Sequence, residues 1–370
     1  MFLKKLSALN FKNLVQAELA FDKRINCLVG GNGAGKTNVM DAVYYLSMCR
    51  SALAMTDGQS VRHGTDFFVL DGEYISDGGR AEHVVCSFRR GDGKALKRNG
   101  KEYERLSEHI GLVPVVIVSP ADTALVNEAA EERRRWLNAF LSQLDKTYLA
   151  AIVRYNHILG ERNRLLKSAF SQDILAILDM QLAEAGETIH RCRAQIAERL
   201  SPHVAEFYRA LSDDAEQVEL HYHSELNDTP FADILAASHE RDRVMQFTTC
   251  GIHRDDLRMR IGGHALRKYG SQGQQKSFLI ALKLAQWAII AEHTGERPLL
   301  LLDDLFDKLD GRRVERLLAL VSRGDFGQIF ITDCNRERLT ATLSAAGEDY
   351  TLFDVRDGEV TCACATQPAG

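Results

Sequence analysis

The sequence predicts an α/β fold in which the two ends of the chain build one domain and a helical segment is inserted between them. Three observations support this prediction. An apolar strand at 25–29 leads into a glycine-rich loop and then a helical stretch. Near the other end, four leucines at 299–302 are typical of a parallel strand that is covered on both faces. Between these regions, from about 122 to 211, turn residues nearly vanish and helical periodicity takes over.

Length and composition set the outer limits. With 370 residues, the chain favours two domains or one domain with a large insertion. Hydrophobic residues make up 45% and charged residues 26%, which excludes a mainly disordered or collagenous protein. No apolar run is long enough for a membrane span and no signal-peptide core is present, so we expect no membrane association. The net charge of −5 means that any nucleic-acid binding must be local.

The eight cysteines are scattered, and several lie in apolar runs, where a thiol serves as a small core residue. This pattern predicts a reducing compartment, the cytoplasm. Cys362 and Cys364 have the wrong spacing for a CxxC zinc knuckle, and no second pair exists. We therefore expect an idle tail there and no structural metal.

The N-terminal part is predicted to be rich in strands. Alternating apolar residues between Leu9 and Phe21 indicate an antiparallel pair, and a buried helix is expected at 38–48 after the glycine loop. Residues 65–120 are predicted to be β structure, with a hairpin signal at Asn99-Gly100. A buried strand follows at 113–118.

The predicted domain boundaries follow from this order of elements. Residues 1–121 and 212–370 are assigned to one head, and residues 122–211 to an inserted helical arm domain. No internal repeat and no long heptad run are present. Further strands are expected at 218–226, 250–261 and 328–332, and a helix at 273–293.

The glycine loop at 30–37 matches G-x-x-x-x-G-K-[ST], the phosphate loop. Glycines let backbone amides and a helix N-terminus face a triphosphate, while Lys36 reaches the β and γ phosphates and Thr37 ligates Mg²⁺. A dinucleotide fingerprint does not fit, because its last glycine position falls on lysine or asparagine. The alternative is a glycine turn with one surface lysine. The expected ATP-binding residues are Gly30, Gly31, Asn32, Gly33, Ala34, Gly35, Lys36, Thr37 and Asn38.

Asp303 and Asp304 stand at the polar end of the 299–302 strand. One carboxylate can complete the Mg²⁺ shell, and the other can orient or deprotonate the attacking water. Two adjacent buried carboxylates would repel each other without a cation nearby. The alternative is a solvated strand end, but beside a phosphate loop we expect Asp303, Asp304 and Lys36 to be catalytic.

The segment 271–277, SQGQQKS, has two interpretations. A serine followed three residues later by glutamine fits a capping box, which needs no ligand. However, it opens the helix before the acidic strand, where ATP-binding-cassette (ABC) ATPases carry an LSGGQ-type signature. There a serine hydroxyl and helix-terminal amides meet the γ-phosphate bound to the other subunit. The candidate residues are Ser271, Gln272, Gly273 and Gln274.

Taken together, the motifs resemble the RecF family of bacterial recombination-repair proteins. The similar segments cover nearly the whole chain. They are GGNGAGKTN at 30–38, SPAD at 119–122, RRRWL at 133–137, ERNRLL at 161–166, GIHRDDL at 251–257, SQGQQKSFLIALK at 271–283 and LLLDDLFDKLD at 300–310.

The resemblance implies an ABC-type ATPase head, related to SMC proteins, with a helical arm. It implies ATP and Mg²⁺ as cofactors, an ATP-dependent homodimer that binds double-stranded or gapped DNA, and slow DNA-dependent hydrolysis that releases it. The implied partners are RecR and RecO, in loading RecA.

The resemblance also implies roles for single residues. Lys36 and Thr37 would hold phosphate and Mg²⁺, Asp303 the metal and Asp304 the water. Ser271 would meet the neighbour's γ-phosphate and Asp310 the dimer interface. The chain departs from the family pattern at Asp307 and Lys308, where a Ser-Glu pair is usual. No switch histidine is present at 331–335, which leaves Thr332 or Asp333 for that position.

DNA contacts are less defined, because no recognition helix or base-reading module is visible. The His253-Arg254-Asp255-Asp256 run fits an ion-paired corner or a nucleotide contact equally well. Binding to the phosphate backbone should depend on shape and salt. The arginine run is more typical of a solvated helix face, which is the alternative to a DNA contact. The candidates are Lys97 and Arg98, with Lys94 and Lys101, at the hairpin tip beside Tyr103, and Arg133 and Arg134, with Arg135, on the arm.

Other classes of protein stay open as alternatives. An ABC transporter subunit would need a membrane partner and normally a shorter helical insertion. An ABC-related nuclease would need a separate acidic metal centre, which the sequence does not show. A full SMC protein would need a long coiled coil, and a small-molecule phosphotransferase remains formally possible.

Overall fold

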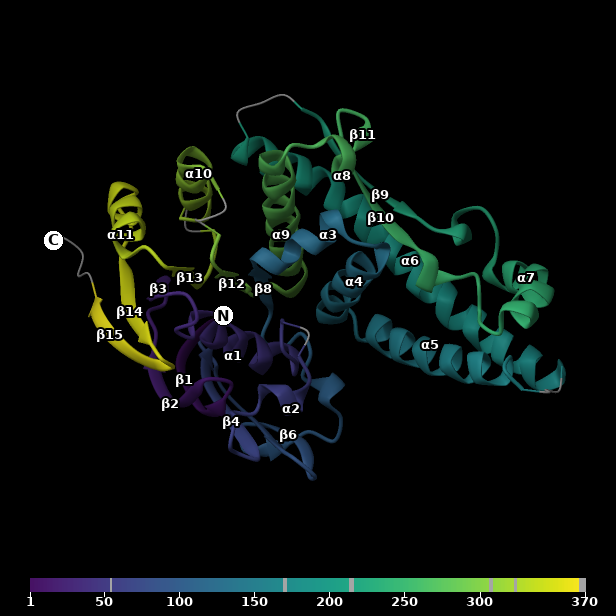
Figure 1. Cartoon of the computed structure of the whole chain (residues 1–370), viewed down its shortest axis with the longest axis horizontal. Coiled ribbons are helices and arrows are strands. Elements are labelled where there is room, and N and C mark those ends of the chain that lie inside the picture. Colours follow the sequence, from purple (N-terminus) through teal and green to yellow (C-terminus); the bar gives the residue numbers. More distant parts are fainter. Residues whose placement is uncertain (54, 169–171, 213–215, 306–308, 323–324, 366–370) are drawn as a thin grey trace. The chain divides into compact units, whose positions relative to one another are not determined.

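The computed structural model describes residues 1–53, 55–168, 172–212, 216–305, 309–322 and 325–365 (Figure 1). The chain forms two compact units, each built from segments that are distant in sequence. Unit 1 comprises Met1–Asp122, Ala210–Asp213 and Lys283–Gly370, and unit 2 comprises Thr123–Arg209 and Asp214–Leu282.

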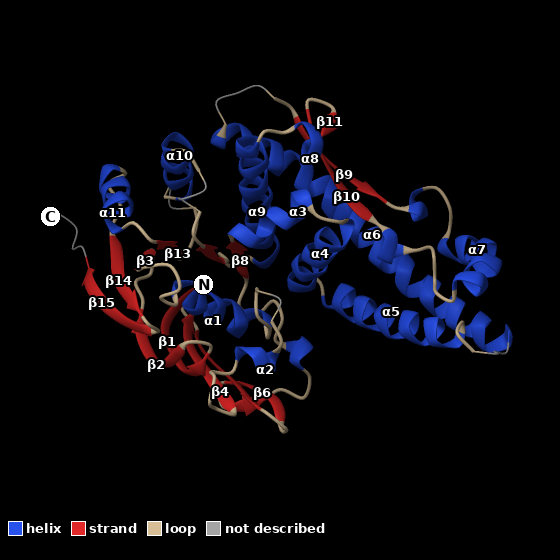
Figure 2. Cartoon of the chain, in the orientation of Figure 1, coloured by secondary structure: helices blue, strands red, loops and turns tan. Residues whose placement is uncertain are grey.

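Unit 1 contains a mainly parallel sheet with the strand order β15-β14-β3-β13-β12-β8 (Figure 2). All neighbouring pairs are parallel except β14 and β15. Every residue of β3, β12 and β13 is buried, as expected for strands covered on both faces. The prediction of a central parallel strand at 299–302 is therefore confirmed. The strands are β3 (Ile25–Val29), β8 (Val115–Val118), β12 (Leu299–Leu302), β13 (Ile329–Asp333), β14 (Tyr350–Arg356) and β15 (Glu359–Ala365).

A second sheet of unit 1 is antiparallel, with the order β2-β1-β4-β5-β6-β7. It confirms the predicted N-terminal pair and most of the β structure expected over 65–120, although residues 103–114 contain no strand. Asn99 and Gly100 join β6 to β7 with φ angles of 50° and 81°, as a tight hairpin requires. The strands are β1 (Phe2–Phe11), β2 (Leu14–Ala20), β4 (Phe67–Ile75), β5 (Ala81–Arg89), β6 (Gly93–Arg98) and β7 (Lys101–Glu102).

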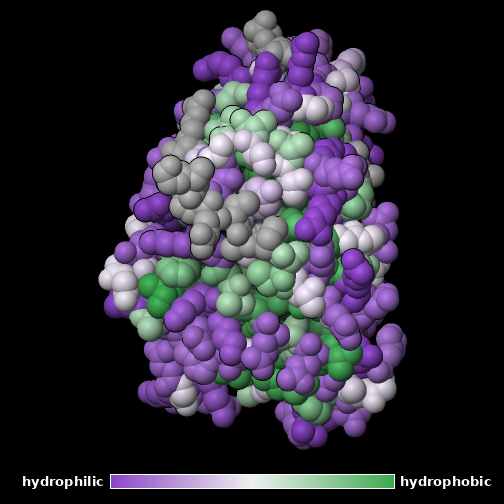
Figure 3. Space-filling model, turned by 90° about the vertical axis from the view of Figure 1, so that its left-hand side faces the viewer, coloured by the Kyte–Doolittle hydropathy of each residue, from purple (hydrophilic) through white to green (hydrophobic). Residues whose placement is uncertain are grey.

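Helices complete unit 1. In α10, Val314, Leu317, Leu318 and Val321 are buried on one face, the spacing of an amphipathic helix. On the side where β15 and α11 lie, the surface is mainly hydrophilic, with hydrophobic residues interspersed (Figure 3). The helices of unit 1 are α1 (Lys36–Met48), α2 (Asp57–Ser60), η1 (Leu106–Glu108), η2 (Pro120–Thr123), α10 (Gly311–Val321), α11 (Arg336–Ala345) and the C-terminal part of α9 (Gln272–Thr294).

Unit 2 combines long helices with a small antiparallel sheet of order β11-β10-β9. Its longest helix, α6, has 40 residues. The unit contains α3 (Ala124–Asn127), α4 (Ala130–Leu144), α5 (Lys146–Leu165), α6 (Gln172–Leu211), β9 (Val218–His223), η3 (Glu225–Asn227), α7 (Phe231–Met245), η4 (Ile252–Arg254), β10 (Asp256–Ile261), β11 (His264–Ala265), α8 (Leu266–Tyr269) and the N-terminal part of α9.

The division into units differs from the predicted boundaries. The helices expected over 122–211 are present, but β9 to α8 and the start of α9 pack with them rather than with unit 1. The cause is the buried face of the small sheet, since β9 and β10 each bury alternate apolar residues and β10 contacts α4. The apolar patterns of 218–282 predicted its strands but not their packing partner.

The C-terminal region corrects a second expectation. Cys362 does not lie in an idle tail, because β15 pairs with β14 and places Cys362 opposite Phe353. Among the described residues, no helix combines the length and the apolar composition needed to cross a membrane.

Candidate functional site

The predicted order of strand, glycine loop and helix is present in unit 1. β3 ends at Val29 and α1 begins at Lys36. Gly35 caps α1 with a φ angle of 119°, a conformation that favours glycine. At Gly30, a Cβ atom would lie 2.2 Å from the carbonyl oxygen of Val355, so β14 leaves room only for glycine. The structure therefore requires glycine at both Gly30 and Gly35, the two glycines that define the phosphate-loop pattern.

Lys36 is buried at the centre of this loop. Its Nζ donates hydrogen bonds to the carbonyl oxygens of Gly30, at 2.8 Å, and Gly31, at 3.1 Å. The ammonium group is thus held beside the loop backbone and the N-terminus of α1. Positive charge at this position suits the binding of a phosphate group.

The acidic pair meets the loop at the carboxyl edge of the parallel sheet. Asp303 follows β12 directly, and Thr37 Oγ1 donates to Asp303 Oδ1 at 3.2 Å across 266 residues of sequence. The hydroxyl of Thr332, in β13, donates to the same Asp303 oxygen at 2.8 Å. The predicted Mg²⁺ ligands Thr37 and Asp303 therefore lie side by side.

The electrostatics of the acidic pair fit a divalent cation. Burial raises the pKa of Asp303, and the neighbouring Asp304 carboxylate adds to this effect, while hydrogen bonds from Thr332 and Thr37 oppose it. Asp304 Oδ1 is buried and has no hydrogen-bond partner among the described residues. A cation offered hydroxyl and carboxylate oxygens would compensate this buried negative charge.

Asp304 itself adopts an uncommon backbone conformation, with a φ angle of 51°. Its backbone N–H donates to Thr332 Oγ1 at 2.8 Å. The Thr332 hydroxyl therefore links the Asp303 carboxylate to the Asp304 backbone. Of the two residues considered for the switch position, Thr332 contacts Asp303 directly, whereas Asp333 pairs with Arg338 at 2.8 Å.

Sequence reasoning missed residues that support the loop from outside. Asn13, in the turn from β1 to β2, donates from Nδ2 to the Ala34 carbonyl at 3.2 Å and accepts from Asn38 at 2.7 Å. The Gly358 N–H donates to the same Ala34 carbonyl at 2.8 Å. Arg62 donates to the Asn13 carbonyl at 2.8 Å. No sequence signal identifies these residues, since each belongs to an ordinary-looking turn or strand end.

The signature segment forms the expected helix start in unit 2. Gln274 N–H donates to Ser271 Oγ at 3.2 Å, and Ser271 N–H donates to the Gln274 side chain at 2.6 Å, which completes a capping box. Ser271 and Gln272 are exposed, and Gly273 and Gln274 are half-buried. As an acceptor in this cap, the Ser271 hydroxyl keeps its own hydrogen for another partner. The loop and the acidic pair lie in unit 1, so this segment belongs to a different unit.

Asp310 caps α10. It accepts from Arg313 N–H at 3.0 Å and pairs with the Arg313 guanidinium at 2.6 Å, and the backbone hydrogen bond is the main cause of its lowered pKa. The side chain is exposed. The departures predicted at Asp307 and Lys308 lie outside the described residues.

The arginines predicted as DNA contacts on the arm are occupied within unit 2. Arg133 Nε donates to Asp256 at 2.6 Å, and its NH1 group donates to the Leu125 carbonyl at 2.9 Å. Arg134 donates to the Asp255 carbonyl at 2.8 Å, and burial lowers its pKa. These contacts favour a structural role for both residues.

The predicted DNA contacts at the β6–β7 hairpin differ in whether their charge is already paired. Arg98 forms a two-pronged pair with Glu82, at 2.8 and 2.6 Å, and Lys94 contacts Asp57 at 2.9 Å. Lys97 is half exposed, with Nζ 3.8 Å from Glu102. Lys97 and Lys101 are exposed, so they are the two hairpin lysines that still fit the predicted DNA contact.

The His253–Asp256 run forms an ion-paired corner, one of its two interpretations. Arg193, fully buried, contacts Asp255 at 2.9 Å and the Ile252 carbonyl at 2.7 Å. Burial lowers the pKa of His253 to about 4, so this ring is neutral. It bonds the Thr248 carbonyl through Nε2 and the Tyr155 hydroxyl through Nδ1.

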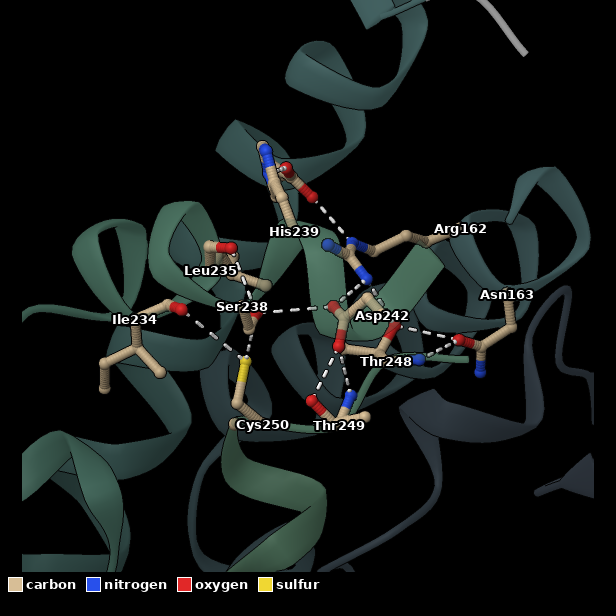
Figure 4. Close-up of polar contacts among 12 residues, drawn as sticks. Arg162, Asn163, Ile234, Leu235, Ser238, His239, Asp242, Thr248, Thr249 and Cys250 are labelled. Carbon is tan, nitrogen blue, oxygen red and sulfur yellow. Dashed lines mark hydrogen bonds and ion pairs between the residues drawn. The ribbon is translucent and has the colours of Figure 1, made fainter. Parts of the chain in front are cut away.

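The ERNRLL segment contributes a second buried network (Figure 4). Arg162, with no exposed surface, contacts Asp179 at 2.6 Å and Asp242 at 2.7 Å, and also donates to the Thr248 hydroxyl at 2.8 Å. His239 contacts Asp179 from the other side at 2.6 Å. These contacts join α5, α6 and α7, so the segment stabilises unit 2.

A parallel sheet with a phosphate loop after β3 and an acidic pair after β12 defines this chain as an ABC-type ATPase head of the SMC class. Residues 2–66 match the family model described as RecF/RecN/SMC N terminal domain. The chain belongs to the RecF family. It is 48% identical over 361 residues to the DNA replication and repair protein RecF of Parabacteroides distasonis, covering 97% of this chain and 99% of that one. It is 47% identical over 363 residues to RecF of Bacteroides thetaiotaomicron, covering 97% and 98%.

Solved structures agree with this assignment. A structure described as the recombination mediator protein RecF-ATP in the RecFOR pathway matches with a TM-score of 0.89 and 31% identity, covering 98% of each chain. A structure described as the Smc head bound to the C-winged helix domain of ScpA matches with a TM-score of 0.61 at 16% identity, covering 100% of this chain and 99% of that one, which shows the shared fold. The predicted RecF resemblance is confirmed, and the transporter, nuclease and phosphotransferase alternatives are not supported.

Proposed function

We propose that this chain is an ATP-dependent DNA-binding protein of recombinational repair and replication. The observation that carries the proposal is the contact between Thr37 of the phosphate loop and Asp303 at the end of β12. It brings a triphosphate-binding backbone, a buried lysine and a carboxylate to one edge of the sheet. A similar solved relative is described as RecF-ATP.

The residues suit a slow ATPase. When bound, Mg²⁺ would neutralise charge on the β and γ phosphates, held by Thr37 and Asp303. Asp304, whose Oδ1 has no hydrogen-bond partner among the described residues, would accept a proton from the attacking water. The Thr332 hydroxyl would position the Asp303 carboxylate and the Asp304 backbone through its two 2.8 Å hydrogen bonds. We propose that DNA stimulates this hydrolysis and that hydrolysis ends DNA binding.

The proposal includes an ATP-dependent homodimer. The exposed Ser271 hydroxyl and the first amides of α9 would meet the γ-phosphate held by a second copy, and Asp310 would lie at the same interface. By family membership, RecO and RecR would be the protein partners in RecA loading, since the solved relatives are described in the RecFOR pathway.

A DNA-binding assay tests the function as a whole. Fluorescence anisotropy on gapped and continuous duplexes, with and without ATP and over a salt series, should show ATP-dependent binding that weakens as salt rises. Lys36→Ala should bind DNA as the nucleotide-free protein does, because it loses the phosphate contact. Binding that ignores ATP, or that ignores salt, would contradict the proposal.

Ser271→Arg should abolish the ATP-dependent dimer while leaving ATP binding close to that of the unmodified protein. The arginine would occupy the space of the second copy's phosphate, whereas the phosphate loop lies in unit 1. Sedimentation velocity with and without ATP measures the dimer, and a fluorescent ATP analogue measures binding. Ser271→Thr is the matched control, because it keeps the hydroxyl and the cap. An arginine variant that still dimerises would count against the composite pocket.

A further inference from the structure

The outer side of the small sheet in unit 2 is strongly basic. Along β10, Leu257, Met259 and Ile261 are buried, while Arg258 and Arg260 alternate with them on the exposed side. The turn into β11 and the short helix α8 add more cationic and aromatic groups. We call this surface the basic face; its residues are Arg258, Arg260, His264, Arg267, Lys268 and Tyr269, all exposed.

The cations of the basic face are not neutralised by the unit itself. Among the described residues, Arg258, Arg260, Arg267 and Lys268 form no ion pair. The neighbouring acids are engaged elsewhere: Asp256 contacts Arg133 at 2.6 Å, and Glu219, opposite Arg260 in the ladder, is bonded by His221 at 2.8 Å. In a chain of net charge −5, this is a local excess of positive charge.

The basic face also contains a hollow and an exposed aromatic pair. A hollow of about 390 Å³ runs along β10, and its lining includes Arg258, Arg260 and Arg267 together with Leu257, Met259 and the Arg133–Asp256 ion pair. Tyr269 is 67% exposed, and its ring lies 4.9 Å from that of His264. Guanidinium groups beside apolar surface attract anions more strongly than groups fully surrounded by water. An exposed aromatic pair adds a flat contact surface for sugar or base.

The distance between Arg258 and Arg260 suits a chain of regularly spaced phosphates. Alternate residues of a strand stand about 6.7 Å apart, so Arg258 and Arg260 can each reach one of two consecutive phosphates along a DNA strand. Guanidinium groups bind phosphate oxygens with two parallel hydrogen bonds, which favours arginine over lysine at such contacts. A folded protein partner would instead need a surface with acidic groups at this same repeat.

We propose that the basic face binds the phosphate backbone of duplex DNA, independently of sequence. This inference rests on the proposed function and assigns its DNA contacts to Arg258, Arg260 and Arg267. It replaces Arg133 and Arg134, whose guanidinium groups bond within unit 2.

The test is a triple variant, Arg258→Ala with Arg260→Ala and Arg267→Ala, in the full-length chain. Its control removes three exposed arginines of unit 2 that also lack ion pairs among the described residues: Arg164→Ala, Arg191→Ala and Arg241→Ala. Both variants change the net charge equally. Duplex binding is measured by anisotropy with ATP present across a salt series, and ATP binding and thermal unfolding report folding.

The triple variant should lose tenfold or more in affinity, and the magnitude of its salt slope, log K against log salt, should fall by about 2.7, or 0.9 for each lost phosphate contact. The control variant should match the unmodified protein, and Arg260→Lys, which keeps the charge, should bind nearly normally. Equal affinities for both triple variants would overturn the inference while the proposed function stands. An unmodified protein that fails to bind DNA with ATP would overturn both.

Discussion

Replacing Asp304 with asparagine should slow ATP hydrolysis by about 10²–10⁴-fold, the usual contribution of a positioned acid–base group. Asparagine matches the carboxylate in size and tolerates the left-handed backbone conformation seen at Asp304, whose φ is 51°. The amide cannot accept a proton from water. ATP binding, which depends on Lys36 and the loop, should stay within a few-fold of the unmodified value. Single-turnover hydrolysis separates these two quantities.

A matched control is Asp354→Asn in β14, a carboxylate of unit 1 that pairs with Arg336 at 3.0 Å. It should hydrolyse ATP at the normal rate. With ATP, the Asp304→Asn protein should sediment as a persistent dimer, because hydrolysis no longer ends the bound state. Normal turnover by Asp304→Asn would remove Asp304 from the proposed mechanism.

Replacing Arg162 with methionine should lower the free energy of unfolding of unit 2 by about 3–5 kcal/mol, because it leaves buried carboxylates without their partner. Asp242 has no exposed surface and Asp179 is largely buried. Methionine fills part of the space but supplies none of the hydrogen bonds. Urea unfolding measures the change. The signal is Trp136 fluorescence in a Trp287→Phe background, since Trp136 is the tryptophan of unit 2.

The control for this stability change is Arg154→Met in the same background. Arg154 pairs with Glu184 at 3.0 Å, but both side chains are well exposed, at 49% and 68%. Exposed pairs contribute about 0–1 kcal/mol, so this variant should unfold close to its background protein. Should Arg162→Met prove as stable as Arg154→Met, the network in Figure 4 would not hold α5, α6 and α7 together.

Much of the nucleotide site was predictable because its chemistry is local in the chain. The loop and Lys36 form one continuous stretch, and the four leucines before Asp303 mark a buried parallel strand whose polar end carries the acids. Phosphate binding by backbone amides depends on this local order of strand, loop and helix. The prediction that Thr37 and Asp303 cooperate needed only the rule that parallel strands share one carboxyl edge.

Other features depended on contacts between distant segments. Asn13 supports the loop only because the turn from β1 to β2 packs beside Ala34. Arg133 resembled a free DNA-binding arginine until the fold placed Asp256 beside it. In the same way, residues 218–282 showed strand patterns but not that their buried face packs on α4.

The sequence by itself determined the central strands, the long inserted helices, the phosphate loop, the acidic pair and the family resemblance, because these depend on residue order and on periodicities of two or 3.6 residues. Only the tertiary structure decided which charged groups are free. For Arg133, the carboxylate partner is Asp256, which lies 123 residues away in the chain. The energy of a charge pair depends on the distance between the two groups in the folded protein, and their separation along the sequence does not determine that distance.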